Sequence, residues 1–411
     1  MESPHEVGSS HDGDSLKTGT YSPVFMFPEC RPDELELSSV SSSSFSEHLE
    51  LSSGPVVIDM GTRSCRAGFS GHHSPSTEVS TLVGYQMGSE EARPEVLIGE
   101  EALLYPDSAV MEVMHNGLII NWEAAESLWK HLLERELQVN PEDHPLLLTE
   151  PPFSPTCSRE IIAEIAFEVL GTPGLFVAPQ SILSVYTHGK ISALVLDMGH
   201  TATRAVPVLE GKSIAYSSKQ TDVAGWCLTW YLSTLLKDMG HTFSEGMVEG
   251  IKCTCCYVTT DFQSHPPPSS HTMDIFLPDG MTLTLSKECF QCPEALFNPL
   301  PNWGDSFVSI QETVQKSLEQ LPKEIMPTMC ANILLCGGSS LFKGLEKRLC
   351  HELQSHLPSG TMVEVVASDL RQHAAWTGGS ILASLYNFQS CWIRPDEYYE
   401  VGPCIVHRKC F

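Results

Sequence analysis

Two short segments of the chain share one pattern, an apolar run that ends in Asp-x-Gly. The first is VVIDMGT at residues 56–62, and the second is ALVLDMG at residues 193–199. An apolar run of this kind is typical of a buried strand, and the glycine after the aspartate permits a turn tight enough for backbone N–H groups to face an anion. A plain β-turn after a core strand explains either copy alone equally well. The duplication favours two similar half-molecules that close on one phosphate chain.

Length and patterning indicate a disordered start followed by two domains. At 411 residues the chain is long enough for two domains of about 150 to 200 residues each. Residues 1–54 are Ser-rich and acidic and lack sustained periodicity, so we expect a disordered tail there. A solvated spacer is favoured over phosphorylation of its serines. From residue 55 onward strand and helix patterns alternate, which predicts an α/β fold with sheets covered by helices.

In the first half, the hairpin is followed by a predicted helix, strand and helix. Asn121 precedes apolar side chains at helical spacing and is expected to be an N-cap. Residues 146–148 form a short buried strand. Ser158 begins a second helix, which Gly171 stops. The second half is expected to repeat this plan.

In the second half, helices are expected at residues 226–236 and at about 245–256, and a third buried strand at 333–336. This strand ends in Gly337 and Gly338. Paired glycines remove side chains where a phosphate or a flat ring approaches the backbone. Close packing of the following helix on the strand explains them equally well.

Composition argues against several classes of function. The chain has 51 Asp and Glu against 24 Lys and Arg, a formal net charge of −27. This charge disfavours a nucleic-acid or anionic-membrane surface and makes a basic partner easier to accommodate. We find neither a run of about 20 apolar residues nor a basic start with an apolar core. We therefore expect no membrane span and no secretory signal, and an intracellular protein.

The 15 cysteines are scattered through apolar segments, which favours reduced thiols in a cytosolic or nuclear setting. Cys289 and Cys292, and the group Cys253, Cys255 and Cys256, have spacings that invite a metal interpretation. Neither group has a second Cys or His pair at the spacing of a zinc ribbon or finger. We therefore expect ordinary buried thiols.

Several longer blocks of the chain match one known family. They are VVIDMG at 56–61, CRAGF at 65–69, HPLLLTE at 144–150, CPEALF at 292–297, GGSILASL at 378–385 and IVHRKCF at 405–411. In these blocks the chain resembles actin and the actin-like proteins, over residues 55–411. The resemblance implies the actin/Hsp70/hexokinase-type ATPase fold, with two similar lobes around a nucleotide cleft. It further implies a first lobe at 55–186, a second lobe at 187–375, and a C-terminal segment at 376–411 that returns to the first lobe.

The resemblance also implies a cofactor, ATP or ADP with Mg²⁺, and the residues that hold it. The nucleotide would be bound by Gly61, Thr62, Arg66, Asp197, Gly199, Lys252, Gly337, Gly338 and Ser339. Asp59 and Asp197 match the carboxylates that organise the hydrated cation, which suits the preference of Mg²⁺ for one or two carboxylates plus phosphate oxygens. Gln180 matches the residue that orients the attacking water.

Other positions of the cleft depart from the actin pattern. His200 replaces a second acidic residue, Arg204 replaces a water-positioning His, and Cys253 replaces a ribose-binding Glu. Thr201 and Arg63 each replace a Gly, Gln372 and Arg66 each replace a Lys, and Glu249 replaces an Arg. Phosphoryl transfer depends mainly on placement and electrostatics, so we expect these changes to slow hydrolysis even where phosphates still bind. Each lost buried hydrogen bond costs on the order of 1 to 3 kcal/mol, which weakens nucleotide affinity.

The leading functional hypothesis is a structural or scaffolding actin-like protein that binds cytoskeletal or other actin-like proteins. Its long tail and its altered segment after Gly84 are most similar to the testis-type actin-like proteins, which implies the cytoplasm and cytoskeleton, and the perinuclear and acrosomal region of sperm. The surface loops diverge, so ordinary actin-like polymers are not expected. The alternative is an active filament-forming ATPase like actin. A metabolic kinase of the same fold is disfavoured by the actin-specific C-terminus.

Overall fold

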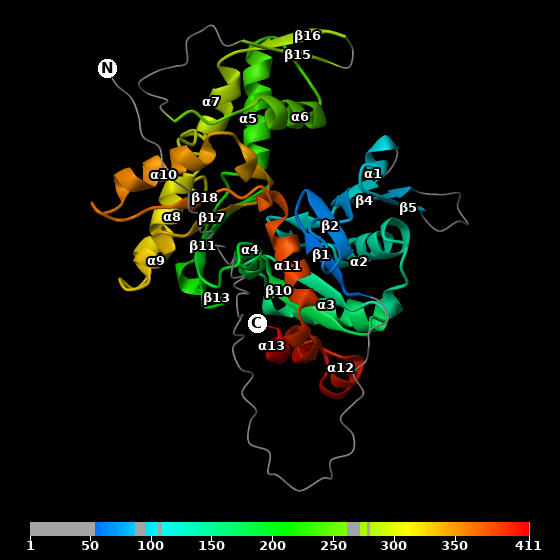
Figure 1. The fold of residues 1–411 in the computed structure, drawn as a ribbon. Coiled ribbons are helices and arrows are strands. Elements are labelled where there is room, and N and C mark those ends of the chain that lie inside the picture. The colour runs from blue at the N-terminus through cyan, green and yellow to red at the C-terminus, as the bar shows by residue number, and fades with distance from the viewer. Residues whose placement is uncertain (1–53, 87–94, 106–108, 261–271, 278–279, 411) are drawn as a thin grey trace, which may run out of the picture. The chain divides into compact units, whose positions relative to one another are not determined.

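The structure is a computed structural model that describes residues 54–86, 95–105, 109–260, 272–277 and 280–410 (Figure 1). Almost all of the tail predicted at residues 1–54 lies outside the described residues. The described residues belong to one compact unit of the chain. The boundaries proposed for its two lobes remain a prediction.

The first sheet is built around the first Asp-x-Gly segment. Its order is β10-β9-β1-β2-β3, with β1 antiparallel to β2 and parallel to β9. These strands are β1 (Val56–Met60), β2 (Ser64–Phe69), β3 (Thr77–Ser80), β9 (Leu146–Glu150) and β10 (Leu175–Pro179). Every residue of β1, β9 and β10 is buried, as expected for continuous apolar runs in parallel strands covered on both faces.

The second sheet repeats this plan around the second Asp-x-Gly segment, as predicted. Its order is β13-β12-β11-β17-β18, and β14 also pairs with β12. Again the first strand, β11, is antiparallel to its neighbour β12 and parallel to a later strand, β17. The strands are β11 (Ala193–Met198), β12 (Thr203–Leu209), β13 (Lys212–Ser213), β14 (Lys219–Thr221), β17 (Ile333–Cys336) and β18 (Val365–Val366). We call β1–β2 the first hairpin and β11–β12 the second hairpin.

Three small sheets complete the strand inventory of the described residues. One has the order β5-β4-β6, and the others are the pairs β7-β8 and β15-β16. Their bounds are β4 (Leu82–Gln86), β5 (Glu95–Ile98), β6 (Ala109–Glu112), β7 (Met114–His115), β8 (Leu118–Ile119), β15 (Met273–Phe276) and β16 (Thr282–Leu285).

The helices confirm the predicted positions with small shifts at their ends. They are α1 (Glu101–Leu104), α2 (Trp122–Lys130), α3 (Thr156–Glu164), α4 (Gln180–Thr187), α5 (Gly225–Asp238), α6 (Glu245–Cys255), α7 (Glu288–Glu294), α8 (Ile310–Glu319), α9 (Met326–Cys330), α10 (Leu345–His356), α11 (Ala374–Ser384), α12 (Pro395–Val401) and α13 (Val406–Lys409). The side chain of Asn121 accepts a hydrogen bond from the Ala124 N–H (3.0 Å), so Asn121 is the N-cap of α2. Helix α3 begins two residues before Ser158, because Pro155 precedes its first turn, and it continues as a π-helix to Val169.

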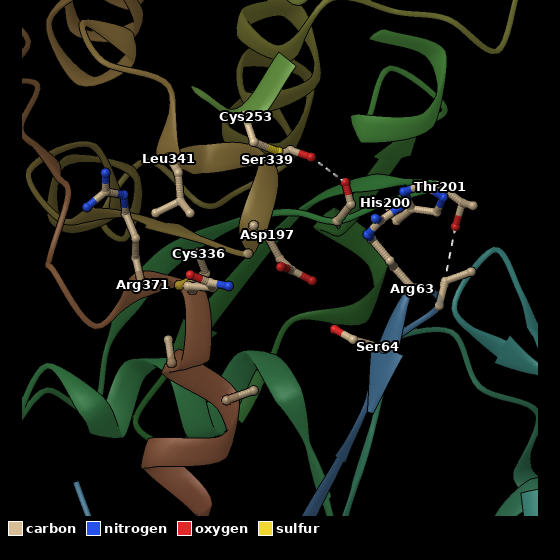
Figure 2. A pocket seen from close by; sticks show the side chains of 18 of the residues that line it. Arg63, Ser64, Asp197, His200, Thr201, Cys253, Cys336, Ser339, Leu341 and Arg371 are labelled. Atoms are coloured by element: carbon tan, nitrogen blue, oxygen red, sulfur yellow. Dashed lines mark hydrogen bonds between the residues drawn. The ribbon is translucent and has the colours of Figure 1, made fainter. Parts of the chain in front are cut away.

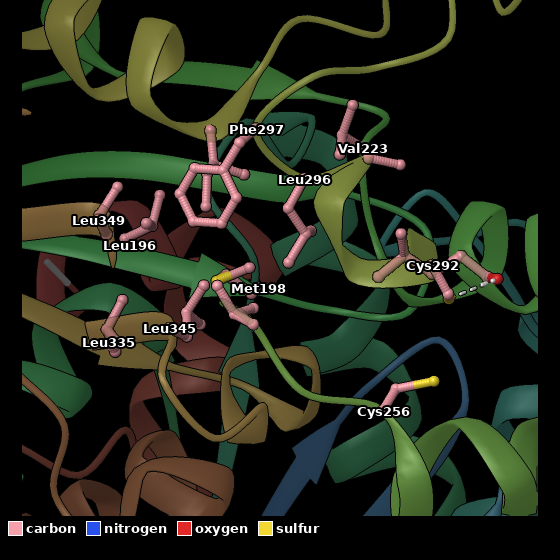
Figure 3. Close-up of a cluster of buried hydrophobic side chains, with 14 of the residues drawn as sticks. Leu196, Met198, Val223, Cys256, Cys292, Leu296, Phe297, Leu335, Leu345 and Leu349 are labelled. Atoms are coloured by element: carbon pink, nitrogen blue, oxygen red, sulfur yellow. Dashed lines mark hydrogen bonds between the residues drawn. The ribbon is translucent and has the colours of Figure 1, made fainter. Parts of the chain in front are cut away.

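A large apolar cluster covers the second sheet (Figure 3). Leu196, Met198 and Leu335 from β11 and β17 pack there against side chains of the surrounding helices. Cys256 and Cys292 are buried in the same cluster, as predicted for packed thiols. Close packing in this cluster holds the ends of β11 and β17 in place. Asp197 and Gly199 lie at the end of β11, and Gly337 follows β17.

The C-terminal segment lies against the first sheet. The indole N–H of Trp376 in α11 donates to the carbonyl of Val57 in β1 (3.0 Å). Helix α11 approaches α4 so closely that a Cβ on Gly378 would lie 1.9 Å from the carbonyl oxygen of Leu183, so only glycine fits there. Among the described residues, no helix has the length and apolar character needed to span a membrane.

Candidate functional site

One cavity of about 900 Å³ is lined by the turns of both hairpins, the end of β17, part of α6 and the segment before α11 (Figure 2). Its volume lies within the range of small-molecule sites in proteins. All eleven residues predicted for the nucleotide, the cation and the attacking water line this cavity: Asp59, Gly61, Thr62, Arg66, Gln180, Asp197, Gly199, Lys252, Gly337, Gly338 and Ser339. The fold therefore brings together residues that are up to 280 positions apart in the chain, from Asp59 to Ser339.

In the first hairpin, the carboxylate of Asp59 is engaged at both oxygens. Its Oδ1 accepts hydrogen bonds from Thr149 Oγ1 (2.6 Å) and Gln180 Nε2 (3.0 Å). Its Oδ2 lies 3.6 Å from Nη1 of Arg66, and Nη2 of Arg66 donates to Glu78 (2.9 Å). Asp59 and Arg66 are direct cross-strand partners in the β1–β2 register, so their side chains share one face of the sheet.

In the second hairpin, Asp197 has the same relation to Arg204. The two are direct cross-strand partners of β11 and β12. Burial raises the pKa of Asp197, and the positive charge of Arg204 opposes this rise without cancelling it. Arg204 is itself buried, and its Nε donates to Gln220 Oε1 (2.9 Å) while its Nη2 donates to the Asn116 carbonyl (2.6 Å).

Each hairpin thus places an arginine seven residues after its aspartate and directly opposite it. From the sequence, Arg66 and Arg204 were matched to two unrelated roles, and this repetition was missed. The equal spacing, 59 to 66 and 197 to 204, is visible in the sequence and could have revealed it. Confirmation that the pairs face each other required the strand register.

Direct hydrogen bonds join the two hairpins and the β7–β8 turn around the cavity. Thr201 Oγ1, labelled in Figure 2, donates to Thr62 Oγ1 (3.3 Å). The N–H of Gly117 donates to the same oxygen (3.1 Å). Arg204 reaches the neighbouring carbonyl of Asn116. Thr201, which the sequence analysis treated as the loss of a glycine, therefore forms a new link between the hairpins.

The paired glycines have different roles. Gly337 has a φ of +83°, and a Cβ there would lie 2.4 Å from the carbonyl oxygen of Met198. This close approach of β17 to the second hairpin requires glycine at 337. A Cβ on Gly338 would meet nothing within 4 Å. The resemblance assigned both glycines to the nucleotide, and that assignment stays a prediction. The close contact at Gly337 is with the second hairpin and not with a following helix, so it is a different packing contact from the one considered from the sequence.

In the part of the cavity formed by α6, the polar side chains make hydrogen bonds within the protein. Lys252 is buried, and its ammonium donates to the Gly225 carbonyl (2.8 Å), to Thr229 Oγ1 (2.8 Å) and to Glu249 Oε2 (2.7 Å). Burial raises the pKa of Glu249, but Lys252 and Thr229 outweigh it and the net pKa is lowered. The thiol of Cys253 points to the other oxygen of Glu249 (3.6 Å). Lys252 and Glu249 form one buried ion pair at the cavity wall.

Two further groups are held in states that matter for hydrolysis. The amide nitrogen of Gln180 donates to Asp59, to the carbonyl of Met60 (3.0 Å) and to Thr149 Oγ1 (3.3 Å). His200 lies beside Arg63 in Figure 2. Burial, together with the positive charges of Arg63 and Lys252, lowers the pKa of His200 to about 4, so its ring is neutral at pH 7.

The two large sheets share one strand plan, and the first and second hairpins line the same cavity. This arrangement defines the actin/Hsp70/hexokinase-type ATPase fold. The family model described as Actin matches residues 50–244 and 238–411. Human actin-like protein 9 is 44% identical over 374 residues, covering 89% of this chain and 90% of that protein. Mouse actin-like protein 9 is 42% identical, covering 90% and 92%, and rat actin-like protein 7A is 38% identical, covering 87% and 83%. The chain therefore belongs to the actin family, which confirms the resemblance stated from its sequence blocks.

Proposed function

We propose that this chain is a structural, scaffolding member of the actin family that binds ATP or ADP in its cavity and hydrolyses it weakly or not at all. The actin family is a family of cytoskeletal proteins, and the coarse cytoskeletal role follows from membership. The finer statements, on nucleotide, hydrolysis, partners and location, are the proposal. The cavity supports nucleotide binding because its size fits and all nine residues assigned to the nucleotide line it.

The proposal of weak hydrolysis rests on the hydrogen bonds that the water-positioning groups make within the protein. The amide nitrogen of Gln180 is held by three oxygen acceptors of the first half. Arg204, at the second such position, is held by Gln220 and the Asn116 carbonyl. A guanidinium has no acceptor for a water proton and cannot act as a base. Because phosphoryl transfer depends on placing the nucleophile, these restraints disfavour turnover.

The alternative is an active filament-forming ATPase. Asp59, Asp197 and Gln180 are retained and meet at one cavity, which supports this alternative. Phosphate release distinguishes the two, since an active enzyme loses most turnover when the water-positioning group is removed.

For partners we propose cytoskeletal or other actin-like proteins, and no nucleic acid. The formal charge of −27 supports a basic partner surface over a polyanion. The location proposed is the cytoplasm and cytoskeleton, in the perinuclear and acrosomal region of sperm. The support for that setting is the resemblance to the testis-type actin-like proteins and the identity shared with actin-like proteins 9 and 7A.

The test begins with the full-length chain, purified without added nucleotide and extracted to identify any ligand bound in stoichiometric amount. Phosphate release from added ATP is then measured for the unmodified chain, for Gln180→Ala and for Gln315→Ala. Gln315 is a matched control, because this half-buried glutamine of α8 donates to Glu319 (2.7 Å) and is not part of the cavity lining. We expect bound or bindable ATP or ADP, and slow release that neither substitution changes. Release at an actin-like rate that Gln180→Ala abolishes would establish the alternative.

A further inference from the structure

The two hairpins carry their own positive charges beside both carboxylates assigned to the cation. Residues 59–66 contain Asp59, Arg63 and Arg66, and residues 197–204 contain Asp197 and Arg204. These segments hold three guanidiniums against two carboxylates, and Glu78, which pairs with Arg66 at 2.9 Å, adds a third carboxylate, so the charges balance and no negative surplus remains. A surplus of negative charge is what attracts a divalent cation to a protein site.

The donor set fits a hydrated Mg²⁺ ion poorly. Both oxygens of Asp59 are engaged, one by Thr149 and Gln180 and the other facing Arg66 at 3.6 Å. Asp197 lies directly opposite Arg204 in the register of the second hairpin. The carboxylates are therefore compensated by arginines of the chain.

Arginine side chains are well suited to neutralise phosphate groups. A guanidinium presents several fixed N–H donors that match phosphate oxygens, and its charge is permanent. Arg66 lines the cavity from the first hairpin and Arg204 from the second. Together they place positive charge where a bound cation would lie between the two hairpins. The Nη1 of Arg66 lies 3.6 Å from the Asp59 carboxylate and Nη2 donates to Glu78 (2.9 Å), so its charge is held beside the carboxylates of the cavity wall.

Arg204 also has a built seat on the first half. A Cβ on Gly117 would lie 2.5 Å from Nη2 of Arg204, so the guanidinium packs directly against this turn, and the φ of +78° favours glycine there. The adjoining Asn116 carbonyl accepts from Arg204 at 2.6 Å. Arg204 therefore links the second hairpin to the β7–β8 turn without any ion.

We propose that the two Asp–Arg pairs take over the charge-compensating and bridging role of a divalent cation, so that the cavity binds the polyphosphate of ATP or ADP without Mg²⁺. This inference rests on the nucleotide binding proposed above. It assigns Arg66 and Arg204 as the phosphate-neutralising groups. It also predicts that nucleotide affinity does not depend on divalent cations. The proposed nucleotide binding alone does not make that prediction.

The test measures binding of ATP and of ADP to the full-length chain by calorimetry, once in excess EDTA and once in millimolar Mg²⁺. We expect the two dissociation constants to agree within about threefold, a difference below 1 kcal/mol. Binding at least about tenfold tighter in Mg²⁺ overturns the inference and leaves nucleotide binding intact. Absence of binding under both conditions overturns this inference and the nucleotide part of the proposed function together.

Two matched variants assign the effect to charge. Arg204→Lys keeps a positive charge, and Arg204→Gln removes the charge while keeping a shorter polar side chain. In EDTA we expect Arg204→Gln to weaken ATP binding about tenfold or more and Arg204→Lys to weaken it less, with Mg²⁺ restoring part of the loss in Arg204→Gln. Equal binding by both variants and the unmodified chain in EDTA overturns the assignment. Because Arg204 is buried, each variant is first required to show a cooperative melt, and Arg66→Gln, at a less buried arginine, provides the same comparison if Arg204→Gln does not fold.

Discussion

The buried pair Lys252–Glu249 at the cavity wall gives the sharpest stability prediction. Its side chains are 4% and 11% exposed, and the ammonium makes three hydrogen bonds within the protein. Lys252→Met keeps the volume of the side chain and removes the charge. It leaves the Glu249 carboxylate buried with Thr229 as its remaining strong donor.

Breaking a buried ion pair by removing one partner costs about 3 to 5 kcal/mol, because the other charge stays buried without compensation. At about 2 °C per kcal/mol, appropriate to a large domain, the melting temperature of Lys252→Met should fall by about 6 to 10 °C. Replacing both partners, as in Glu249→Met/Lys252→Met, removes the stranded charge, so its cost should be within about 1.5 kcal/mol of zero.

Differential scanning fluorimetry and urea unfolding of the unmodified chain and both variants measure these differences. The pH dependence adds a second check. The folded-state pKa of Glu249 is lowered, so the pair stabilises the protein above the pKa of an unfolded Glu and this contribution is lost as pH falls through the folded pKa. The gap between the unmodified chain and Lys252→Met should therefore shrink on acidification. Equal destabilisation in the single and double variants would refute the reasoning.

Three further predictions follow from single residues. Gly337→Ala should cost about 1 to 3 kcal/mol, since it combines a φ of +83° with a clash against the second hairpin, whereas Gly338→Ala should be near neutral in urea unfolding. The pKa of His200 is about 4 in the folded state against 6.5 when unfolded, so the unfolded chain takes up a proton first and stability falls as pH drops through this window. His200→Gln should lose less stability than the unmodified chain between pH 6.5 and pH 4, and an equal loss would contradict this. Arg159→Ala should speed proteolysis of the C-terminus, because Arg159 bonds both the carboxylate at the end of β9 and a backbone carbonyl near the C-terminus, while the exposed Arg408→Ala should not.

The strands of both hairpins were predictable because their cause is local. Val56, Val57 and Ile58 are β-branched and continuous, and Gly61 follows the aspartate, so the strand and its turn follow from a few neighbouring residues. The same holds for the N-cap Asn121 and for the strand that ends at Cys336. The predicted site residues all line one cavity. Most lie at or just after the ends of β1, β10, β11 and β17, whereas Arg66 lies within β2 and Lys252 in α6.

Other expectations depended on contacts that local patterns do not contain. Lys252 lines the cavity, and its assignment to the nucleotide stays a prediction. The sequence did not indicate that Glu249, one helical turn away, and Thr229 of α5 accept hydrogen bonds from its ammonium. Thr201 was interpreted as a lost glycine, and it forms a link to Thr62, 139 positions earlier. Such partners are chosen by which helices and turns meet, and single-sequence patterns do not report that.

The sequence by itself determined two Asp-x-Gly hairpins, the actin-type fold and the set of residues around one cavity. It did so because apolar periodicity, glycine positions and family-specific blocks are properties of short segments. Only the tertiary structure decided that Asp59 faces Arg66 and Asp197 faces Arg204, and that Arg204 is seated on the Asn116–Gly117 turn. The physical reason is that strand register and the meeting of distant turns set which charges lie opposite each other, and those charges decide what the cavity binds.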